Sequence, residues 1–372
     1  MTLFDARSPT VVLTAVMLAA CGGSDSEKDI GKIDTVEQPG QEDLMLKQLP
    51  AANETVYLNL ETGALVDQSG EWHIAANRLS LQLNGGASGN GAVGGAIAVE
   101  QSDFYNAEGE PDVSVFTNAT ANSEEEHLRG EFQEPDAWQQ DDFSSAFGAA
   151  DVWSTYDRVT GVISEKDDIG YLVRSAEGDS HARMRVVDFN FPTRAGKGIE
   201  SFAFEFDVQA AGASQFNSTP VVFTPPADYD GADACFDFDS AKVVDCAGSS
   251  AWDVQVGFSG REWYLKSSGQ GGAAGPMPRA ELASYNADPG VPQLYTSDST
   301  GGILSEYPWY AYNLTGQHKI WPNYRTFLIK SDIENDASSV WALQVVGYYD
   351  ESGASGQPVV RWLEVNPKQT QE

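Results

Sequence analysis

The stretch that decides the fold is Trp153-Ser154-Thr155-Tyr156-Asp157, which leads through Thr160-Gly161 into Tyr171-Leu172-Val173-Arg174. The same pattern returns as Trp309-Tyr310-Ala311-Tyr312-Asn313, which leads through Thr315-Gly316 into Phe327-Leu328-Ile329-Lys330. In both places 18 positions separate the tryptophan from the aromatic residue of the later strand (171 − 153 and 327 − 309). Because the spacing is the same, the chain is predicted to contain two copies of one structural unit.

The two repeats extend from about Val56 to Val208 and from about Ala234 to Val365. Each begins with a strand, a turn and a second strand, and each then has a lone tryptophan (Trp72, Trp252) and a glycine-rich run. The predicted divisions are a signal peptide (1–20), a lipidated cysteine with a flexible acidic tether (21–50), a first β domain (51–210), a linker (211–233), a second β domain (234–366) and a C-terminal tail (367–372).

Alternation of apolar and polar residues dominates both repeats. The segments 183–189, 202–208 and 252–256 place apolar side chains at every second position, which is typical of half-buried strands. Short strands bounded by Gly, Asn, Asp and Pro recur along the chain. The predicted fold class is therefore all-β, with two tandem antiparallel domains of the same sandwich or barrel-like fold. Short helical turns are expected only around 135–150.

The N-terminus has the features of a bacterial lipoprotein signal. An apolar run over 11–20 is too short for a permanent membrane span, and it ends in Leu18-Ala19-Ala20-Cys21, the pattern that precedes a lipid-modified cysteine. Several acyl chains on Cys21 would anchor the protein to a membrane without crossing it. Because Gly22 and not Asp follows the cysteine, we expect the outer membrane. The sequence leaves open whether the protein faces the periplasm or the cell surface.

Composition excludes one class of partner. The chain carries 22 Lys and Arg against 55 Asp and Glu, a formal charge of −33. Nucleic-acid binding needs clustered cations that neutralise phosphates, so no nucleic-acid partner is expected.

The remaining cysteines, Cys235 and Cys246, flank the first predicted hairpin of the second repeat. A two-residue turn at Ser240-Ala241 would place them directly opposite each other, at a separation that suits a disulfide. An exported protein meets an oxidising compartment, which favours this pairing. A metal-binding thiol pair is the alternative, but no third Cys or nearby His supports it.

Taken together, these segments resemble the HmuY family of haem-binding bacterial lipoproteins. The resemblance rests on 57–63, 72–75, the Leu-Asn-Gly-Gly run at 83–89 and the Trp-x-x-Tyr segments of both repeats. It implies an all-β fold, display at the cell envelope, and capture of haem b for delivery to an outer-membrane receptor of the TonB-dependent class. Family members hold the iron through two axial side chains, His in some and Met in others.

Axial ligation requires an imidazole or thioether beside an apolar slot. The axial candidates are His318, which has aromatic neighbours, Met277 between two prolines, and His127 in a glutamate-rich stretch. Lys319 and Arg325 are the candidate contacts for the haem propionates. His73 follows the inward-pointing Trp72 and is therefore expected to face solvent. Because the repeats diverge at 101–151 and 277–325, the function is expected in these loops, with the second favoured.

Other chemistries are weaker. The run 228–233 resembles part of a calcium loop but lacks the further acidic ligand and the flanking helices of an EF-hand. No nucleophile–base pair or isolated carboxylate pair stands out, so the protein is not expected to be an enzyme. The alternative to haem capture is a non-enzymatic interaction module of the envelope with the same fold and no haem.

Overall fold

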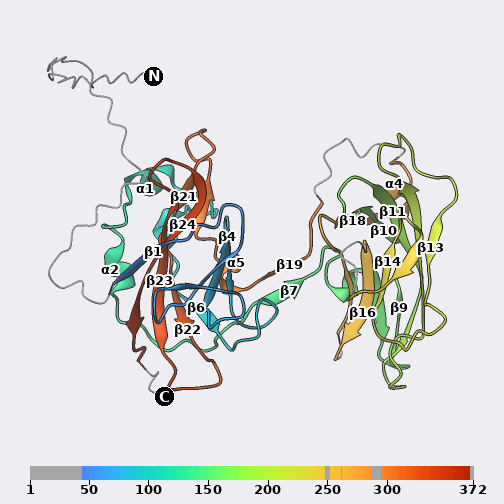
Figure 1. The fold of residues 1–372 in the computed structure, drawn as a ribbon, viewed down its shortest axis with the longest axis horizontal. Coiled ribbons are helices and arrows are strands. Elements are labelled where there is room, and N and C mark those ends of the chain that lie inside the picture. The colour runs from blue at the N-terminus through green and yellow to red at the C-terminus, as the bar shows by residue number, and fades with distance from the viewer. Residues whose placement is uncertain (1–43, 248–251, 261, 286–294, 369–372) are drawn as a thin grey trace, which may run out of the picture.

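The computed structural model describes residues 44–247, 252–260, 262–285 and 295–368 (Figure 1). Antiparallel strands make up most of these residues, and they form two units with separate hydrophobic cores. The predicted all-β class is confirmed. The predicted signal peptide, Cys21 and most of the tether lie outside the described residues.

The first unit comprises residues 44–141 and 302–368. Its larger sheet has the order β1 (Met45–Gln48), β24 (Ser355–Val365), β23 (Val340–Tyr349), β22 (Thr326–Lys330), β6 (Gly94–Val99). Its smaller sheet has the order β3 (Leu65–Val66), β2 (Val56–Leu58), β4 (Ile74–Asn77), β5 (Ser80–Leu83). A hairpin of β20 (Tyr310–Tyr312) and β21 (Ile320–Pro322) stands beside them.

The second unit comprises the described residues between 145 and 298. Its larger sheet has the order β13 (Val221–Phe223), β12 (Ser201–Gln209), β11 (His181–Pro192), β10 (Ile169–Arg174), β18 (Gly272–Pro278), with β8 (Ser154–Asp157) and β9 (Val162–Glu165) joined to β11. Its smaller sheet has the order β15 (Lys242–Val244), β14 (Ala234–Asp237), β16 (Val254–Ser259), β17 (Glu262–Lys266).

Each unit therefore combines one half of each sequence repeat. In the first unit β6 of the first repeat pairs with β22 of the second, and in the second unit β10 of the first repeat pairs with β18 of the second. The strand pairing thus differs from the predicted limits of 51–210 and 234–366. Sequence alignment identifies equivalent strands, but it does not tell which copy of an edge strand completes which sheet.

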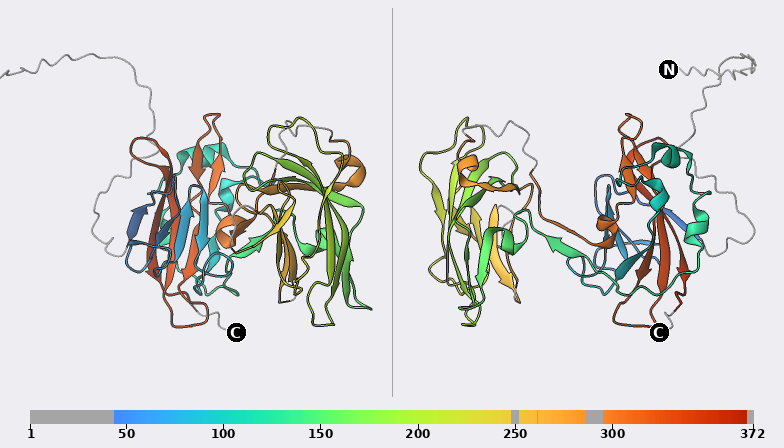
Figure 2. Two further views of the ribbon diagram at one scale, coloured as in Figure 1. Left: turned by 45° about the vertical axis from the view of Figure 1, so that its right-hand side comes forward. Right: turned by 180° about the vertical axis from the view of Figure 1, so that it is seen from behind.

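A two-stranded ribbon connects the units. Strands β7 (Asp142–Ser144) and β19 (Ser299–Gly301) pair antiparallel, with Phe143 opposite Thr300. The ribbon is seen running between the two bodies in Figure 2. The second unit is thus an insertion between β6 and the β20–β21 hairpin of the first.

Alternation explains how the strands bury their apolar side chains. Along β12 the side chains of Phe202, Phe204 and Phe206 point into the core of the second unit and are at most 1% exposed. Their equivalents on β24 belong to the first unit, where Trp362 is 1% exposed and its indole N–H donates to the Leu60 carbonyl at 2.8 Å. Burial of such a set of large side chains stabilises each unit separately.

Two predicted boundaries also differ from the structure. The tether was expected to reach residue 50, yet β1 pairs with β24 and Leu49 is fully buried. The linker was expected over 211–233, yet β13 pairs with β12. Both are short edge strands, whose few apolar residues lie among prolines and charges and give little periodic signal.

The helices are short, and most were not predicted. They are α1 (Val113–Asn118), α2 (Glu125–Leu128) and α5 (Ile303–Glu306) in the first unit, and α3 (Ala150–Trp153) and α4 (Arg279–Leu282) in the second, with a 3-10 turn η1 (Ser102–Phe104). None of the helices within the described ranges has the length and apolarity that crossing a membrane requires.

Candidate functional site

The exchange of halves brings two divergent loops together on the first unit. The segment 101–128 of the first repeat lies against 309–326 of the second. Three hydrogen bonds join them: Gln101 Nε2 to Tyr324 O (3.3 Å), Asn323 Nδ2 to Tyr105 Oη (2.8 Å) and Thr326 Oγ1 to His127 O (3.2 Å). Gln344 Nε2 on β23 also donates to Glu124 O at 3.2 Å, which joins the first segment to the sheet. We call the face formed by 101–128 and 309–325 the loop surface.

Aromatic side chains fill the interior of the loop surface. They form a cluster with small apolar residues: Phe104, Phe116, Ala311, Trp321, Tyr324, Val346 and Val359. Phe104 meets Phe116 edge-on, with ring centroids 4.9 Å apart. Beside them is an open cavity of about 350 Å³, lined by Asp103, Phe104, Ser114, Val115, Asn118, Ala119, Ser123 and Glu124. The cavity is within the size range of small-ligand sites, but its lining includes no His or Met.

His318 lies in the turn of the β20–β21 hairpin. Its backbone is in the left-handed region (φ 57°), and its N–H donates to the Asn313 side chain at 2.8 Å, which fixes the turn. The imidazole Nδ1 is hydrogen-bonded to the Tyr312 hydroxyl at 2.7 Å. This bond orients the ring and leaves Nε2 as the nitrogen for a metal, as outer partners do for metal-bound histidines. The side chain is exposed.

The two predicted propionate contacts differ in how they are held. Lys319 follows His318 in the turn and is exposed. Arg325 donates to two backbone carbonyls, Glu100 O (Nε, 2.9 Å) and Pro308 O (Nη1, 2.9 Å), and its guanidinium lies over the ring of Tyr105. Arg325 therefore fastens the two segments of the loop surface to each other, while Lys319 is the cation nearest His318 in sequence.

The other two ligand candidates lie elsewhere. His127 is on α2, where its Nε2 lies 3.7 Å from Glu124 Oε2. Met277 belongs to the second unit and is packed among Leu172, Ala274 and Leu282 with 9% of its surface exposed. The structure thus places His318 and His127 on one unit, each with its own partners, and Met277 on the other. Burial keeps the Met277 thioether from an external ligand.

A buried cation supports the sheet beneath the loop surface. Arg361 on β24 is 3% exposed and donates twice to Gln344 Oε1, from Nε at 2.9 Å and from Nη2 at 2.7 Å. Glu125 of α2 lies 3.5 Å from Nη1. Burial lowers the pKa of Arg361 to about 10. Sequence reasoning missed this network, because an arginine within an alternating strand looks solvent-facing until a loop covers it.

His73 was expected to face solvent, and this is wrong. It is 9% exposed, its Nδ1 accepts the Leu60 N–H at 3.1 Å, and its ring meets Trp341 edge-on. Asp253 holds the equivalent place in the second unit, where it is fully buried and accepts the Phe238 and Ala176 N–H groups, each at 2.8 Å. Both residues precede an alternating strand, so the alternation could not be carried back to them. Their shared role is to satisfy backbone donors of the preceding turn.

Because of His73 and Asp253, the stabilities of the two units are expected to change with pH in opposite directions. Burial lowers the pKa of His73 from 6.5 to about 4, so the unfolded chain takes up a proton first as pH falls from 6.5, and the first unit loses stability. Burial, with Asp239 and Asp237 nearby, raises the pKa of Asp253 from 3.8 to about 7, so the second unit loses stability as pH rises from 3.8 to 7. Each contribution is on the order of 3 kcal/mol.

Calorimetric unfolding at several values between pH 4 and 7 measures both slopes. The controls are His73→Gln and Asp253→Asn, because the change in slope that each causes isolates its residue from the general effect of net charge. The expectation fails if both variants change the slope in the same direction.

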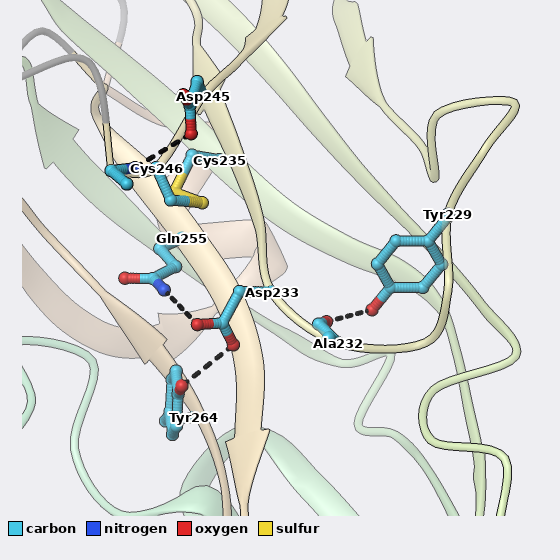
Figure 3. Close-up of a disulfide and its surroundings, with 9 residues drawn as sticks. Tyr229, Ala232, Asp233, Cys235, Asp245, Cys246, Gln255 and Tyr264 are labelled. Atoms are coloured by element: carbon cyan, nitrogen blue, oxygen red, sulfur yellow. Dashed lines mark hydrogen bonds between the residues drawn. A yellow bond between two sulfur atoms is a disulfide. The ribbon is translucent and has the colours of Figure 1, made fainter.

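One group of acidic residues could hold a metal ion. The ligand atoms of Glu177, Asp239 and Asp253 lie within 4.8 Å of one another on adjoining turns of the second unit. Asp239 also accepts the Ser180 hydroxyl at 2.5 Å. The run 228–233, which resembles part of a calcium loop, is arranged differently. Figure 3 shows the Asp233 carboxylate engaged by Gln255 (2.9 Å) and Tyr264 (2.9 Å).

Figure 3 also shows the predicted disulfide between Cys235 and Cys246, whose Cα atoms are 5.3 Å apart. The predicted strand register is wrong, because Cys235 stands opposite Val244 and Asp237 opposite Lys242. The Asp237 carboxylate accepts the Ser240 N–H at 3.0 Å and its hydroxyl at 2.7 Å, which stabilises a turn of four residues in place of two. Cys246 therefore lies just beyond the strand.

Removing this disulfide should affect only the second unit. The bridge closes a loop with a sequence separation of 11, so the double variant Cys235→Ser/Cys246→Ser is expected to lower the free energy of unfolding of that unit by about 3 kcal/mol or less. Denaturation with and without reductant measures the change. A loss in the first unit as well would show that the two units unfold as one.

Residues 51–204 match the HmuY protein family. Over these 154 of the 372 residues (204 − 51 + 1) the chain is similar to the HmuY family. The match spans one sequence repeat, and it therefore covers parts of both structural units. No curated protein matches the chain.

Two solved structures from Bacteroides cover most of this chain at low similarity. One, from B. vulgatus, is classed as HmuY-like and heme-binding; it shows 9% identity and a TM-score of 0.29, with 86% of this chain and 91% of that chain covered. The other, from B. fragilis, is classed as a lipoprotein; it shows 10% identity and a TM-score of 0.29, with 87% and 93% covered. Likeness at this level carries no argument about ligand or site.

Proposed function

We propose that the protein is a non-enzymatic haem-binding lipoprotein that takes up haem b on the loop surface through His318. The observation that carries the proposal is the HmuY family match over residues 51–204. The geometry of the hairpin turn supports His318 as the ligand, because Tyr312 orients its imidazole and the side chain is exposed.

The residues of the turn suit the chemistry of haem. A neutral imidazole with one nitrogen engaged is a common iron ligand, and haem sites with a single protein ligand exist. Tyr312, which is 57% exposed, offers an aromatic face beside the porphyrin. Lys319 supplies a positive charge for a propionate within an otherwise acidic protein. When bound, haem would supply the iron centre, and the chain would position it.

The predicted location follows from the N-terminal segment. Lipidation of Cys21 would hold the protein at the outer membrane, and the acidic residues 22–43 would give the two units reach from that anchor. Haem captured there would pass to an outer-membrane receptor of the TonB-dependent class. Binding of haem and its transfer to that receptor would be separate steps.

Titration with ferric haem tests the proposal. The whole mature chain should sharpen the Soret band and saturate at one haem per chain, and His318→Ala should lower the affinity at least tenfold. The matched control is His127→Ala, which removes the other histidine of the loop surface and should leave the spectrum unchanged. Tyr312→Phe should give a smaller loss than His318→Ala, because it removes only the bond that orients the ring.

The alternative is an envelope interaction module that binds no haem. It is favoured by the separation of the ligand candidates, since His127, His318 and Met277 contact different partners. An unchanged haem spectrum at micromolar protein would support this alternative and end the haem proposal.

A further inference from the structure

In each unit, strand pairs join a strand of one repeat to a strand of the other, and we call these pairs the seams. The inner seam is β6–β22 in the first unit and β18–β10 in the second, and its register is the same in both. In the first unit Leu328 stands opposite Ala96 and Ile329 opposite Gly95; in the second unit their equivalents Leu172 and Val173 stand opposite Ala274 and Ala273. The outer seam repeats this agreement, with Trp362 opposite Met45 and Phe206 opposite Val221. The same strands could therefore pair within one repeat without a shift in register.

The chain crosses between the units at points where its segments touch. In the second unit the Asp298 carboxylate accepts the Ala146 N–H at 2.8 Å. In the first unit Gly302, the equivalent of Ala146, lies against Gln140 and Asp141. If each repeat formed its own unit, residues 142–145 would connect its two halves in the first repeat and residues 299–301 would do so in the second. These loops of four and three residues have lengths that are common between elements. Each repeat can thus close on itself.

One position distinguishes the exchanged arrangement from one in which each repeat forms its own unit. A Cβ added to Gly302 would lie 2.8 Å from the Gln140 carbonyl oxygen and 3.3 Å from Asp141 Cα, closer to backbone than real side chains come. The first half of the first repeat, through Gln140 and Asp141, therefore leaves room only for glycine at this position. The first half of the second repeat accepts alanine, because Ala146 sits there with 6% exposure. In self-closed repeats Ala146 would occupy the position that requires glycine.

We propose that the chain can close its sheets in two ways, exchanged or self-closed, and that Ala146 and Gly302 select the exchanged closure. The two closures share their strand pairs and core positions, as is usual when identical elements are exchanged. They differ in the β7–β19 ribbon and in the loop surface, which exist only when the halves of the two repeats combine.

Exchanging the two residues should reverse the selection. The double variant Ala146→Gly/Gly302→Ala places glycine where a self-closed first repeat needs it and puts an obstructing Cβ into the exchanged first unit. Because alanine and glycine only trade places, the double variant leaves the composition and the net charge unchanged. The control is the wild-type chain handled in the same way.

A protease site tells the closures apart. It is inserted between Ser214 and Gln215, in an exposed loop between the repeats, in the mature full-length chain. After unfolding, refolding and cleavage, an exchanged chain elutes in gel filtration as one particle that holds both fragments. A self-closed chain elutes as two peaks of about half the mass. We expect one peak for the wild type and two for the double variant. One folded peak for both would overturn the proposal, and so would two for the wild type.

A cross-link keeps the proposal testable if the double variant folds poorly. Ala96→Cys with Leu328→Cys reports the exchanged seam, and Ala96→Cys with Leu172→Cys reports the self-closed seam, in chains with Cys21→Ser. Ala146→Gly alone adds no obstruction to either closure and should raise the Ala96–Leu172 cross-link above its wild-type level. Absence of that cross-link in every folded variant would contradict a second closure.

Discussion

Replacing Trp309 with alanine is expected to destabilise strands of the first repeat and to spare the equivalent strands of its own repeat. Trp309 is 1% exposed, and its indole N–H donates to the Leu79 carbonyl at 3.1 Å, in the turn between β4 and β5. Loss of so large a buried side chain costs about 3–5 kcal/mol. The loss falls on the first unit because Trp309 packs only in that core.

The matched variant is Trp153→Ala, at the equivalent position of the first repeat. Trp153 is fully buried in the core of the second unit, where its ring meets Phe189 edge-on. Hydrogen exchange read by mass spectrometry should show faster exchange at 74–83 in Trp309→Ala and at 254–266 in Trp153→Ala. Repeats that fold independently would give the opposite assignment, and this result would contradict the strand pairing described above.

Replacing Arg361 with methionine should lower the free energy of unfolding of the first unit by about 3–5 kcal/mol. The variant keeps much of the side-chain length but leaves Gln344 Oε1 without its two donors. Glu125 loses one of its two cations and keeps Arg129, at 2.6 Å. Removing one member of a buried polar set leaves the others unpaired in a low-dielectric interior, which is the main cost.

The second unit provides a control for this prediction. Glu205 is the equivalent of Arg361, and Arg185 the equivalent of Gln344; their ion pair at 3.2 Å is partly exposed. Glu205→Gln should therefore change stability by less than about 1 kcal/mol. Denaturant unfolding followed separately in each unit compares the two. Equal losses of unfolding free energy in the two variants would show that burial of Arg361 beneath α2 does not increase its contribution to stability.

The sequence predicted the strands well because their signals are local. Alternation along 183–189 and 202–208 places every second side chain in a core, and the repeated Trp-x-x-Tyr segments mark equivalent strands. The pairing of the halves is not local. It depends on which copy of an edge strand reaches a sheet, and the two copies are alike at the seams, apart from small differences such as Ala146 against Gly302.

The site was predictable only in part, for similar reasons. His318, Lys319 and Arg325 are candidates by residue type and neighbours, whereas the contact of Tyr312 with His318 depends on a hairpin that brings the two together. The Trp-x-x-Tyr pattern contained Tyr312, yet its repetition in both copies favoured a scaffold role. Met277 between two prolines looks like a loop residue in the sequence, but Leu172, which is distant in sequence, and Leu282 of the following helix α4 bury it.

The most direct test of the account is a ferric haem titration of the first unit alone, made by replacing residues 142–301 with a short Gly-Ser linker between Asp141 and Gly302. Because these two residues are in contact, the linker need not strain the fold. We predict a folded β protein that binds one haem with the spectrum and affinity of the full chain and loses both with His318→Ala. A folded first unit that leaves the haem spectrum unchanged, while the full chain binds, would contradict the assignment of the site to the loop surface.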